Sequence, residues 1–340
     1  MHSFMNDYSE GAHPRILDLL NKYNLEKNGG YGLDDHSDIA KKYIKRELGR
    51  DDVDIHFIAA GTLTNVLTIS AFLKPYQAVI SADSGHINVH ETGAVETSGH
   101  KVISVPTIDG KLRPDHIIKV LNYHQDEHMV QPKMVYISNT TELGTVYTKE
   151  ELKAISKCSR ENNLILFMDG ARLGSALTCK SNDLSLEDIA GLVDVFYIGG
   201  TKNGALLGEA LVLIRDDLKE DFRYLIKNRG ALMAKGFVLG IQFEALFQDS
   251  LYFDLAEHAN IMACDLTKII SDKDYKFFIK PYSNQLFPIF PNAILEKMKD
   301  EFVFSIHEKI DEDNTAIRLV TSWATKEESV DAFRSFLERY

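Results

Sequence analysis

The sequence has few cysteines, and none of them occur in the closely spaced pairs that bind zinc. The three cysteines are Cys158, Cys179 and Cys264, and no Cys-x-x-Cys motif is present. An odd number of widely spaced cysteines argues against both a disulfide framework and a zinc site, and it favours a reducing compartment. We therefore expect a cytoplasmic protein.

Long hydrophobic segments and an excess of basic residues are also absent. No segment approaches the roughly 20 apolar residues that span a bilayer, and the N-terminal residues lack the cationic start and apolar run of a secretory signal. The chain has 38 basic and 50 acidic residues, giving a formal net charge of −12. Because nucleic-acid binding needs clustered Lys and Arg against phosphate, this composition predicts neither a nucleic-acid partner nor a membrane partner.

The sequence does contain enough apolar residues for a large core, since 44% of its 340 residues are hydrophobic. Short apolar runs typical of buried parallel strands occur at residues 55–58, 78–81, 102–105, 133–137, 164–168, 194–198 and 210–214. Helical patterns lie between most of these runs. The chain is therefore predicted to be an α/β protein whose mostly parallel, seven-stranded sheet is covered by helices on both faces.

Local signals predict where several helices begin and how the chain divides. Residues 148–151, Thr-Lys-Glu-Glu, fit a capping box, and Asp115 after Pro114 is expected to cap another helix. Long helical stretches at 236–249 and 251–270 are followed by shorter mixed segments. We predict a large domain over residues 25–250 and a small α+β domain over 251–340, with residues 1–24 packed beside the small domain.

Chemically reactive residues follow four of the predicted strands. Gly61-Thr62, His86, Asp169 and Lys202 each come shortly after an apolar run. Ligands of parallel sheets bind beyond the C-terminal ends of the strands. We therefore expect these residues to converge at one edge of the sheet.

Asp169 and Lys202 each have two interpretations. Asp169 is either a helix cap or a carboxylate that keeps the ring nitrogen of pyridoxal phosphate (PLP) protonated. Lys202 lies among Gly199, Gly200 and Gly204, where it is either a solvated turn residue or an amine of lowered pKa that acts as a nucleophile. Its spacing of 33 residues from Asp169, with one helix and one strand between them, favours the cofactor hypothesis.

The two other segments are also ambiguous when taken alone. Gly61-Thr62 opens a helix, so it is either an ordinary turn or an anion site for a phosphate. His86 and His90 share a helical face, and Glu91 follows. These three residues are a weak metal-site candidate, because they lack the His-Glu-x-x-His order. Alternatively, His86 covers the cofactor ring and moves protons.

The ordered motifs GTxTN at Gly61, GHI at Gly85 with a nearby HE, DGARL at Asp169, and GGTKNG around Lys202 resemble the threonine aldolase and β-eliminating lyase family of fold type I PLP-dependent enzymes. The resemblance covers almost the whole chain. It implies that Lys202 forms the Schiff base with PLP, that Asp169 pairs with the ring nitrogen, and that His86 stacks on the ring. Gly61 and Thr62 then match the turn that binds the phosphate.

The resemblance also implies residues around the substrate. Arg318 matches the arginine that holds the substrate α-carboxylate, and Arg172 matches an arginine near the cofactor and the substrate. Asn6 is expected on the substrate side and Thr201 on the cofactor side. His128 resembles a second histidine that reaches the substrate hydroxyl.

Family members assemble as dimers or tetramers with active sites at the subunit interface. The resemblance therefore implies a homodimer or homotetramer, in which Tyr31 and Lys227 serve the site of a neighbouring subunit. No metal is implied.

The expected activity is the cleavage of a β-hydroxy-α-amino acid of the L-threonine or L-allo-threonine type to glycine and an aldehyde. His86 or His128 is the expected base for the hydroxyl proton. The alternatives are a PLP-dependent β-eliminating lyase or aminotransferase, a non-catalytic PLP-fold binding protein, and a metal enzyme built on His86, His90 and Glu91.

The chain departs from the family pattern at several positions. Leu63 replaces a common Gln, and Thr201 replaces a common Ser. The stretch Asn-Thr-His-Asn becomes Asn-Thr-Thr-Glu at 139–142, and Gly-Gly-Gly-Met becomes Gly-Ala-Leu-Met at 230–233. The last two stretches are expected near the substrate, so they bear on the choice of substrate more than on the cofactor.

Overall fold

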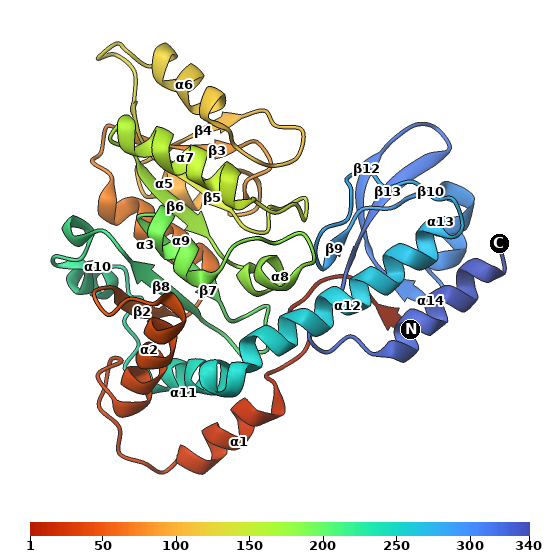
Figure 1. Ribbon diagram of the computed structural model, residues 1–340, viewed down its shortest axis with the longest axis horizontal. Coiled ribbons are helices and arrows are strands. Elements are labelled where there is room, and N and C mark those ends of the chain that lie inside the picture. The colour runs from red at the N-terminus through yellow and green to blue at the C-terminus, as the bar shows by residue number, and fades with distance from the viewer.

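The main feature of the computed structural model, which describes residues 1–340, is a seven-stranded sheet (Figure 1). The order of its strands is β2-β8-β7-β6-β5-β3-β4. The strands are β2 (Asp54–Ile58), β3 (Gln77–Ala82), β4 (Lys101–Val105), β5 (Gln131–Ser138), β6 (Ile165–Asp169), β7 (Val195–Gly199) and β8 (Glu209–Leu213). Each of the seven predicted apolar runs forms one of these strands, so the predicted mostly parallel sheet is confirmed.

One strand of this sheet runs against the others. β8 pairs antiparallel with both β2 and β7, whereas β7, β6, β5, β3 and β4 run parallel to one another. The expectation that all seven runs are parallel is therefore wrong for β8. The reason is the short connection 200–208 between β7 and β8, which contains no helix. A parallel neighbour would need a longer crossover connection.

Helices cover both faces of the sheet, because alternate residues of each strand point to opposite sides. On β5, Val135 and Ile137 belong to a core of 46 buried residues, while Met134 and Tyr136 belong to a core of 20 on the other face. The larger core is covered by α2 (Asp35–Leu48), α6 (Pro114–Tyr123), α7 (Lys149–Glu161), α8 (Leu173–Thr178), α9 (Leu186–Leu192) and α11 (Phe237–Phe247). The smaller core is covered by α3 (Gly61–Phe72), α4 (His86–Val89), α5 (Ala94–Thr97) and α10 (Phe222–Asn228).

The predicted helix starts agree with the structure at α7 and differ at α6. Thr148 and Glu151 form the expected capping box, in which each side chain accepts from the other residue's backbone N–H. The N-cap of α6 is Arg113, and Pro114 occupies the first helical turn. Asp115 therefore lies inside that turn and is not the cap, since Pro at the first helical position fixes the start two residues earlier than expected.

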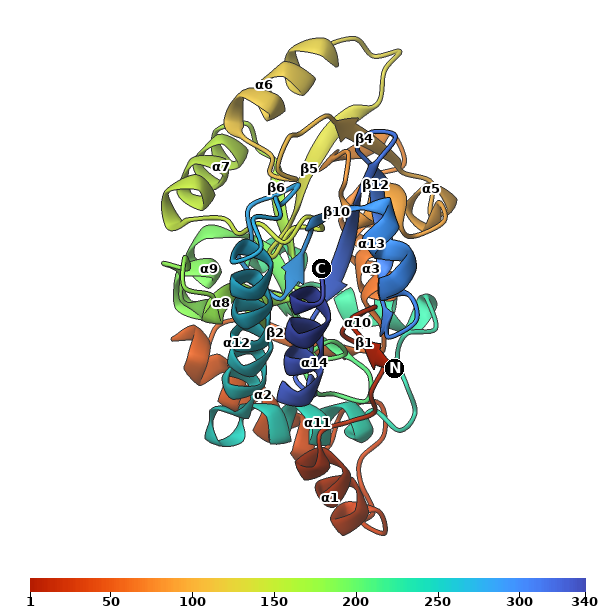
Figure 2. The same cartoon turned by 90° about the vertical axis from the view of Figure 1, so that its right-hand side faces the viewer.

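The smaller part of the molecule begins at the long helix α12 (Leu251–Ser271), which contacts α8 of the large part and α14 (Glu327–Glu338) of the small part. Figure 2 looks onto this part, where α12 and α14 lie side by side. Its antiparallel strands pair in the order β10-β13-β12, with β9 also on β13. The other elements here are β9 (Gln285–Leu286), β10 (Ile289–Pro291), α13 (Asn292–Met298), β11 (Phe302–Val303), β12 (Ser305–Lys309) and β13 (Asn314–Val320).

The first residues of the chain connect the two parts. β1 (His2–Ser3) pairs with β11, and Phe4 is buried in the core of the small part. α1 (Pro14–Tyr23) instead contacts α11, and its Ile16 belongs to the core of the large part. Residues 1–24, which we expected beside the small domain, thus divide between both parts. None of the helices combines the length and the apolar character that a membrane span requires.

Candidate functional site

The site lies at the C-terminal edge of the parallel strands, in a cavity of about 290 Å³. It is lined by residues that follow β2, β3, β5, β6 and β7. The lining includes all seven residues that the sequence analysis assigned to the cofactor: Gly61, Thr62, His86, Asp169, Arg172, Thr201 and Lys202. The strand ends therefore bring together the residues that were selected from separate stretches of sequence.

The site is built around Asp169, the last residue of β6, which is 4% exposed. Its Oδ2 accepts hydrogen bonds from Tyr136 Oη at 2.6 Å and Asn65 Nδ2 at 3.1 Å, and its Oδ1 accepts from the backbone N–H of Ala171 at 2.9 Å. Burial would raise the pKa of Asp169, but the nearby His86 and these hydrogen bonds outweigh it and lower the pKa. Asp169 therefore stays an anion that faces the cavity.

Asp169 is not a helix cap. The following helix, α8, begins at Leu173, and its N-cap residue is Arg172. The capping interpretation of Asp169 is therefore wrong, which leaves the interpretation as a carboxylate that serves a ligand.

Lys202 enters the same cavity from the loop after β7. The loop is held by Glu209, whose Oε1 accepts from Thr201 Oγ1 at 2.8 Å and whose Oε2 accepts from the backbone N–H of Gly200 at 3.0 Å. Burial, followed by the charge of Arg172, lowers the pKa of Lys202. An amine with a lowered pKa is a better nucleophile at neutral pH. Burial also raises the pKa of Glu209 to about 8.

The N-terminus of α3 supplies hydrogen-bond donors to the cavity. Its N-cap residue, Ala60, makes no side-chain cap, and the backbone N–H groups of Gly61 and Thr62 have no acceptor in the protein. Free N–H groups at the start of a twelve-residue helix favour an anion such as phosphate.

His86 is oriented by a buried carboxylate. Its Nδ1 donates to Glu91 Oε1 at 2.8 Å, and Asn65 Nδ2 donates to the same oxygen at 2.7 Å. Asn65 Nδ2 also donates to Asp169. The Asn65 amide therefore links the Glu91 carboxylate, which orients His86, to the Asp169 carboxylate at the end of β6. The bond to Glu91 sets the tautomer of the ring and leaves Nε2 free.

A second cavity of about 290 Å³ adjoins the first and includes residues from both parts of the molecule. It is lined by Tyr8, His86, His90, Glu142, Arg172, Lys202, Gln285 and Arg318. Arg172 is neutralised by Asp7, with Nε–Oδ2 and Nη2–Oδ1 distances of 2.7 and 2.9 Å. Arg318 has no acidic partner, and its buried Nε makes no hydrogen bond. Burial, followed by Arg172, lowers the pKa of Arg318, so this cavity favours an anionic ligand.

Some of the predicted site residues lie elsewhere. His128 precedes β5, whose C-terminal end carries the site, and its side chain is 86% exposed. The structure therefore does not bring His128 to this cavity, because a residue before a parallel strand lies at the opposite edge of the sheet. Asn6 precedes Asp7 in the chain, but Asn6 itself lines neither cavity. Its Oδ1 accepts hydrogen bonds from the Tyr8 backbone N–H and the Ser9 hydroxyl.

Tyr31 and Lys227 also lie outside both cavities. Lys227 Nζ lies 4.6 Å from the centre of the Tyr31 ring, on a surface that also exposes Leu33 and Tyr224. Their expected role toward a neighbouring subunit is compatible with this exposed position.

The sequence analysis missed several residues of the site. Asp7 was overlooked because its partner Arg172 lies 165 residues away. Glu91 follows His86 by five residues and was considered only as a metal ligand. Glu142 had a signal, since it falls in the stretch 139–142 that departs from the family pattern.

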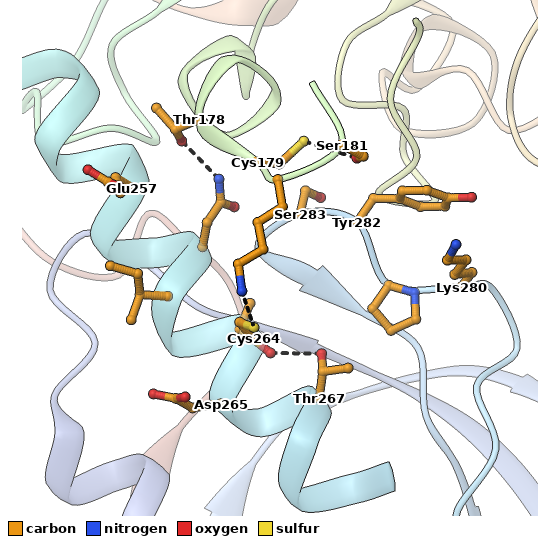
Figure 3. Close-up of a pocket in the computed structure, with 15 residues that line it drawn as sticks. Thr178, Cys179, Ser181, Glu257, Cys264, Asp265, Thr267, Lys280, Tyr282 and Ser283 are labelled. Carbon is orange, nitrogen blue, oxygen red and sulfur yellow. Dashed lines mark hydrogen bonds between the residues drawn. The ribbon is translucent and has the colours of Figure 1, made fainter. Parts of the chain in front are cut away.

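The structure contains a further cavity of about 370 Å³ away from these residues, between α8, α12 and residues 280–283 (Figure 3). Within it, Lys180 Nζ donates to Cys264 Sγ at 3.4 Å. None of the residues that the sequence analysis selected lines this cavity. No three His, Cys, Asp or Glu side chains anywhere in the structure are grouped so that they could hold a metal ion, and Glu91 is already engaged by His86 and Asn65.

The residues of the first cavity fit PLP. An anionic carboxylate at Asp169 suits a protonated ring nitrogen, the free N–H groups of α3 suit the phosphate, and Lys202 suits the aldehyde carbon. The imidazole of His86 lines the same cavity and can cover the ring. Each group of the cofactor thus has a side chain or backbone group of matching chemistry.

Comparisons with known proteins agree with this geometry. A solved structure of Leishmania major threonine aldolase is 49% identical, covers 100% of this chain and 99% of that chain, and has a TM-score of 0.99. The low specificity L-threonine aldolase of Pseudomonas aeruginosa is 33% identical over 337 residues, 96% of this chain and 94% of that protein. A Thermus thermophilus aspartate aminotransferase mutant, 14% identical with a TM-score of 0.74, shares the fold alone. The model of the beta-eliminating lyase family matches residues 24–290. The chain therefore belongs to the beta-eliminating lyase family.

Proposed function

We propose that this protein is a PLP-dependent aldehyde-lyase that cleaves a β-hydroxy-α-amino acid, of the L-threonine or L-allo-threonine type, to glycine and an aldehyde. The similarity to two threonine aldolases over nearly the full chain supports this activity. The observation that best supports the proposal is that Lys202 and Asp169 line one cavity, and that the adjoining cavity is lined by Arg318, a cation without an acidic partner. This arrangement suits an amino acid bound beside PLP.

The residues of the large part would hold the cofactor. Lys202 would attach it covalently, Asp169 would hold a proton on the ring nitrogen, and Gly61 and Thr62 would bind the phosphate. Thr201, through its bond to Glu209, would fix the loop that carries Lys202. When bound, PLP supplies an electron sink for the bond that breaks at the substrate Cα.

The residues of the second cavity would hold the substrate. Arg318 would bind the α-carboxylate with charge-assisted hydrogen bonds, which are about twice as strong as neutral ones. Arg172 is neutralised by Asp7, so it would contribute mainly by positioning. A carboxylate fixed on Arg318 orients the other substituents of Cα toward Lys202 and His86.

The first experiment is the visible absorption spectrum of the purified protein, before and after the addition of L-threonine. We expect a yellow protein whose absorption band changes with threonine, together with the release of acetaldehyde and glycine. Lys202→Ala should lose the band and the cleavage completely, because it lacks the amine that binds the cofactor. Lys180→Ala, an exposed lysine outside both cavities, is the matched control and should keep both.

A colourless protein that stays colourless after incubation with PLP would overturn the cofactor. A yellow protein that binds amino acids but releases no aldehyde would instead point to an aminotransferase or a β-eliminating lyase.

We also propose that a second copy of this chain covers the exposed surface around Tyr31, Leu33, Tyr224 and Lys227. Two tyrosines and a leucine exposed together suit a protein interface better than bulk water. A monodisperse, active monomer in sedimentation would contradict this homo-oligomer.

A further inference from the structure

The proposed cleavage needs a proton acceptor that the histidines do not readily provide. As the C–C bond breaks, the β-hydroxyl loses its proton and its O–H electron pair becomes the second bond of the aldehyde C=O. His128 lies at the opposite edge of the sheet. His90 is exposed at the rim of the second cavity. His86, if it stacks on the cofactor ring, presents its flat face and not its nitrogens in that direction.

Glu142 lies where the two cavities adjoin, and it lines both of them. It follows β5 in the turn that the hydrogen bond from Thr141 N–H to Thr145 O helps to close. The cavities bring it together with Lys202 and His86 on one side and with Arg318 on the other. A substrate that spans Lys202 and Arg318 therefore passes beside Glu142.

The two carboxylate oxygens of Glu142 have different environments. Oε1 accepts from the backbone N–H of His86 at 2.9 Å and from Ser138 Oγ at 2.8 Å. Oε2 has no hydrogen-bond partner and is not among the fully buried unpaired atoms, so it is accessible from the cavity. One oxygen is thus fixed to the framework while the other remains free for a ligand.

The surroundings also suit a base. Burial, followed by the nearby Asp169 carboxylate, raises the pKa of Glu142. A carboxylate whose pKa is raised toward neutral pH accepts a proton more readily than an ordinary surface carboxylate.

We infer that Glu142, through Oε2, accepts the proton of the substrate β-hydroxyl. This inference rests on the proposed function. The electron pair of the broken bond remains with Cα until Cα takes up a proton, and Glu142 gives up the proton it accepted. Substrate and products therefore differ by no net proton, and the carboxylate is regenerated for the next turnover.

The variant that tests the inference is Glu142→Gln. The amide oxygen of Gln can still accept from His86 N–H and Ser138, while its NH₂ group cannot take a proton. Two reactions of the PLP-loaded protein are compared: the cleavage of L-threonine, and the exchange of the glycine α-hydrogen in heavy water, followed by NMR. Only the first reaction requires a base for a hydroxyl.

We expect kcat for cleavage to fall by about 100-fold or more, because a general base contributes about 10²–10⁴-fold. Glycine exchange, the affinity for glycine measured by calorimetry, and the thermal midpoint should stay close to wild type. The acid limb of the pH profile of kcat should also disappear. Glu150→Gln, an exposed glutamate on α7, is the control and should change none of these quantities.

Cleavage by Glu142→Gln within a few-fold of wild type would overturn the inference and leave the proposed function intact. An equal loss of cleavage and exchange would also overturn it, since that result means that Glu142 only positions His86. A wild-type protein that cleaves no β-hydroxy amino acid would remove both the inference and the proposed function.

Discussion

The cofactor half and the substrate half of the site are built in different ways. The cofactor half consists of residues at strand ends of one sheet, such as Asp169 and Lys202, fixed by buried hydrogen bonds within the large part. The substrate half combines the N-terminal segment, the turn after β5 and the small part, which contributes Gln285 and Arg318. A movement between the two parts of the molecule would therefore change the substrate half and leave the cofactor half unchanged.

The two halves also differ in how their charges are balanced. In the cofactor half, Asp169 lies near Lys202 and His86, so acidic and basic groups are both present. In the substrate half, Arg318 has no acidic partner. The cofactor half is thus organised before any ligand binds, whereas the substrate half needs an anion to complete it.

The largest expected effect that separates the halves comes from Arg318→Gln. Losing two charge-assisted hydrogen bonds costs about 3 kcal/mol, so KM for threonine should rise roughly 100-fold. The visible spectrum of the protein without substrate should not change, because Arg318 lies outside the cofactor cavity. Steady-state kinetics and absorption measure the two quantities. Arg334→Gln, on the surface of the same part, is the control, and a large spectral change in Arg318→Gln would contradict the separation.

A comparable effect, on stability and not on substrate binding, is expected from Asp7→Asn, which leaves the Arg172 charge without its buried partner. Breaking such a buried ion pair lowers the free energy of unfolding by about 3 kcal/mol. Urea unfolding at neutral pH measures this difference. Burial would raise the pKa of Asp7, but Arg172 and Lys202 outweigh it and lower the pKa.

The sign of the pH dependence follows from that lowered pKa. The stabilisation by Asp7 is present above the unfolded-state pKa of about 4, and it is lost as the pH falls through the lower folded-state pKa. The difference between wild type and Asp7→Asn should therefore shrink below about pH 4. A difference that persists unchanged at lower pH would contradict the role of the charge.

The smallest effect is expected from His128→Ala. Its side chain is 86% exposed, and the one hydrogen bond of its ring is to Asp126. We therefore expect kcat and KM to stay within about 2-fold of wild type, and the free energy of unfolding within about 0.5 kcal/mol. Steady-state kinetics and thermal unfolding are the measurements. A loss of cleavage in this variant would place His128 in the site of a neighbouring subunit and would make the substrate half depend on assembly.

Sequence reasoning predicted the cofactor half better than the substrate half for a physical reason. His86, Asp169 and Lys202 each follow an apolar run, and a strand end fixes where the next residues lie. The same rule applied to His128 would have excluded it, because it precedes the run at 133–137. Its assignment came from the family resemblance and not from its position along the chain.

The missed features depend on contacts between distant segments. Arg172 donates a hydrogen bond to Asp7, and Gln285 donates one to the turn at 139–142, across the boundary between the two parts. No local sequence pattern predicts such long-range contacts. The antiparallel direction of β8, in contrast, is predictable from the sequence. The connection 200–208 is too short for the crossover that a parallel strand would need.

The pairing of β1 with β11 has a consequence for the order in which the halves form during synthesis. The last strand of the large sheet, β8, ends at Leu213, so the cofactor half can be complete while the remainder of the chain is still being translated. His2 and Ser3 are synthesised before the strands of the large sheet, yet their partners Phe302 and Val303 are synthesised well after them. The segment that carries Asp7 is thus anchored at both ends only after the small part has been synthesised, so the ability to bind substrate is acquired after the ability to bind the cofactor.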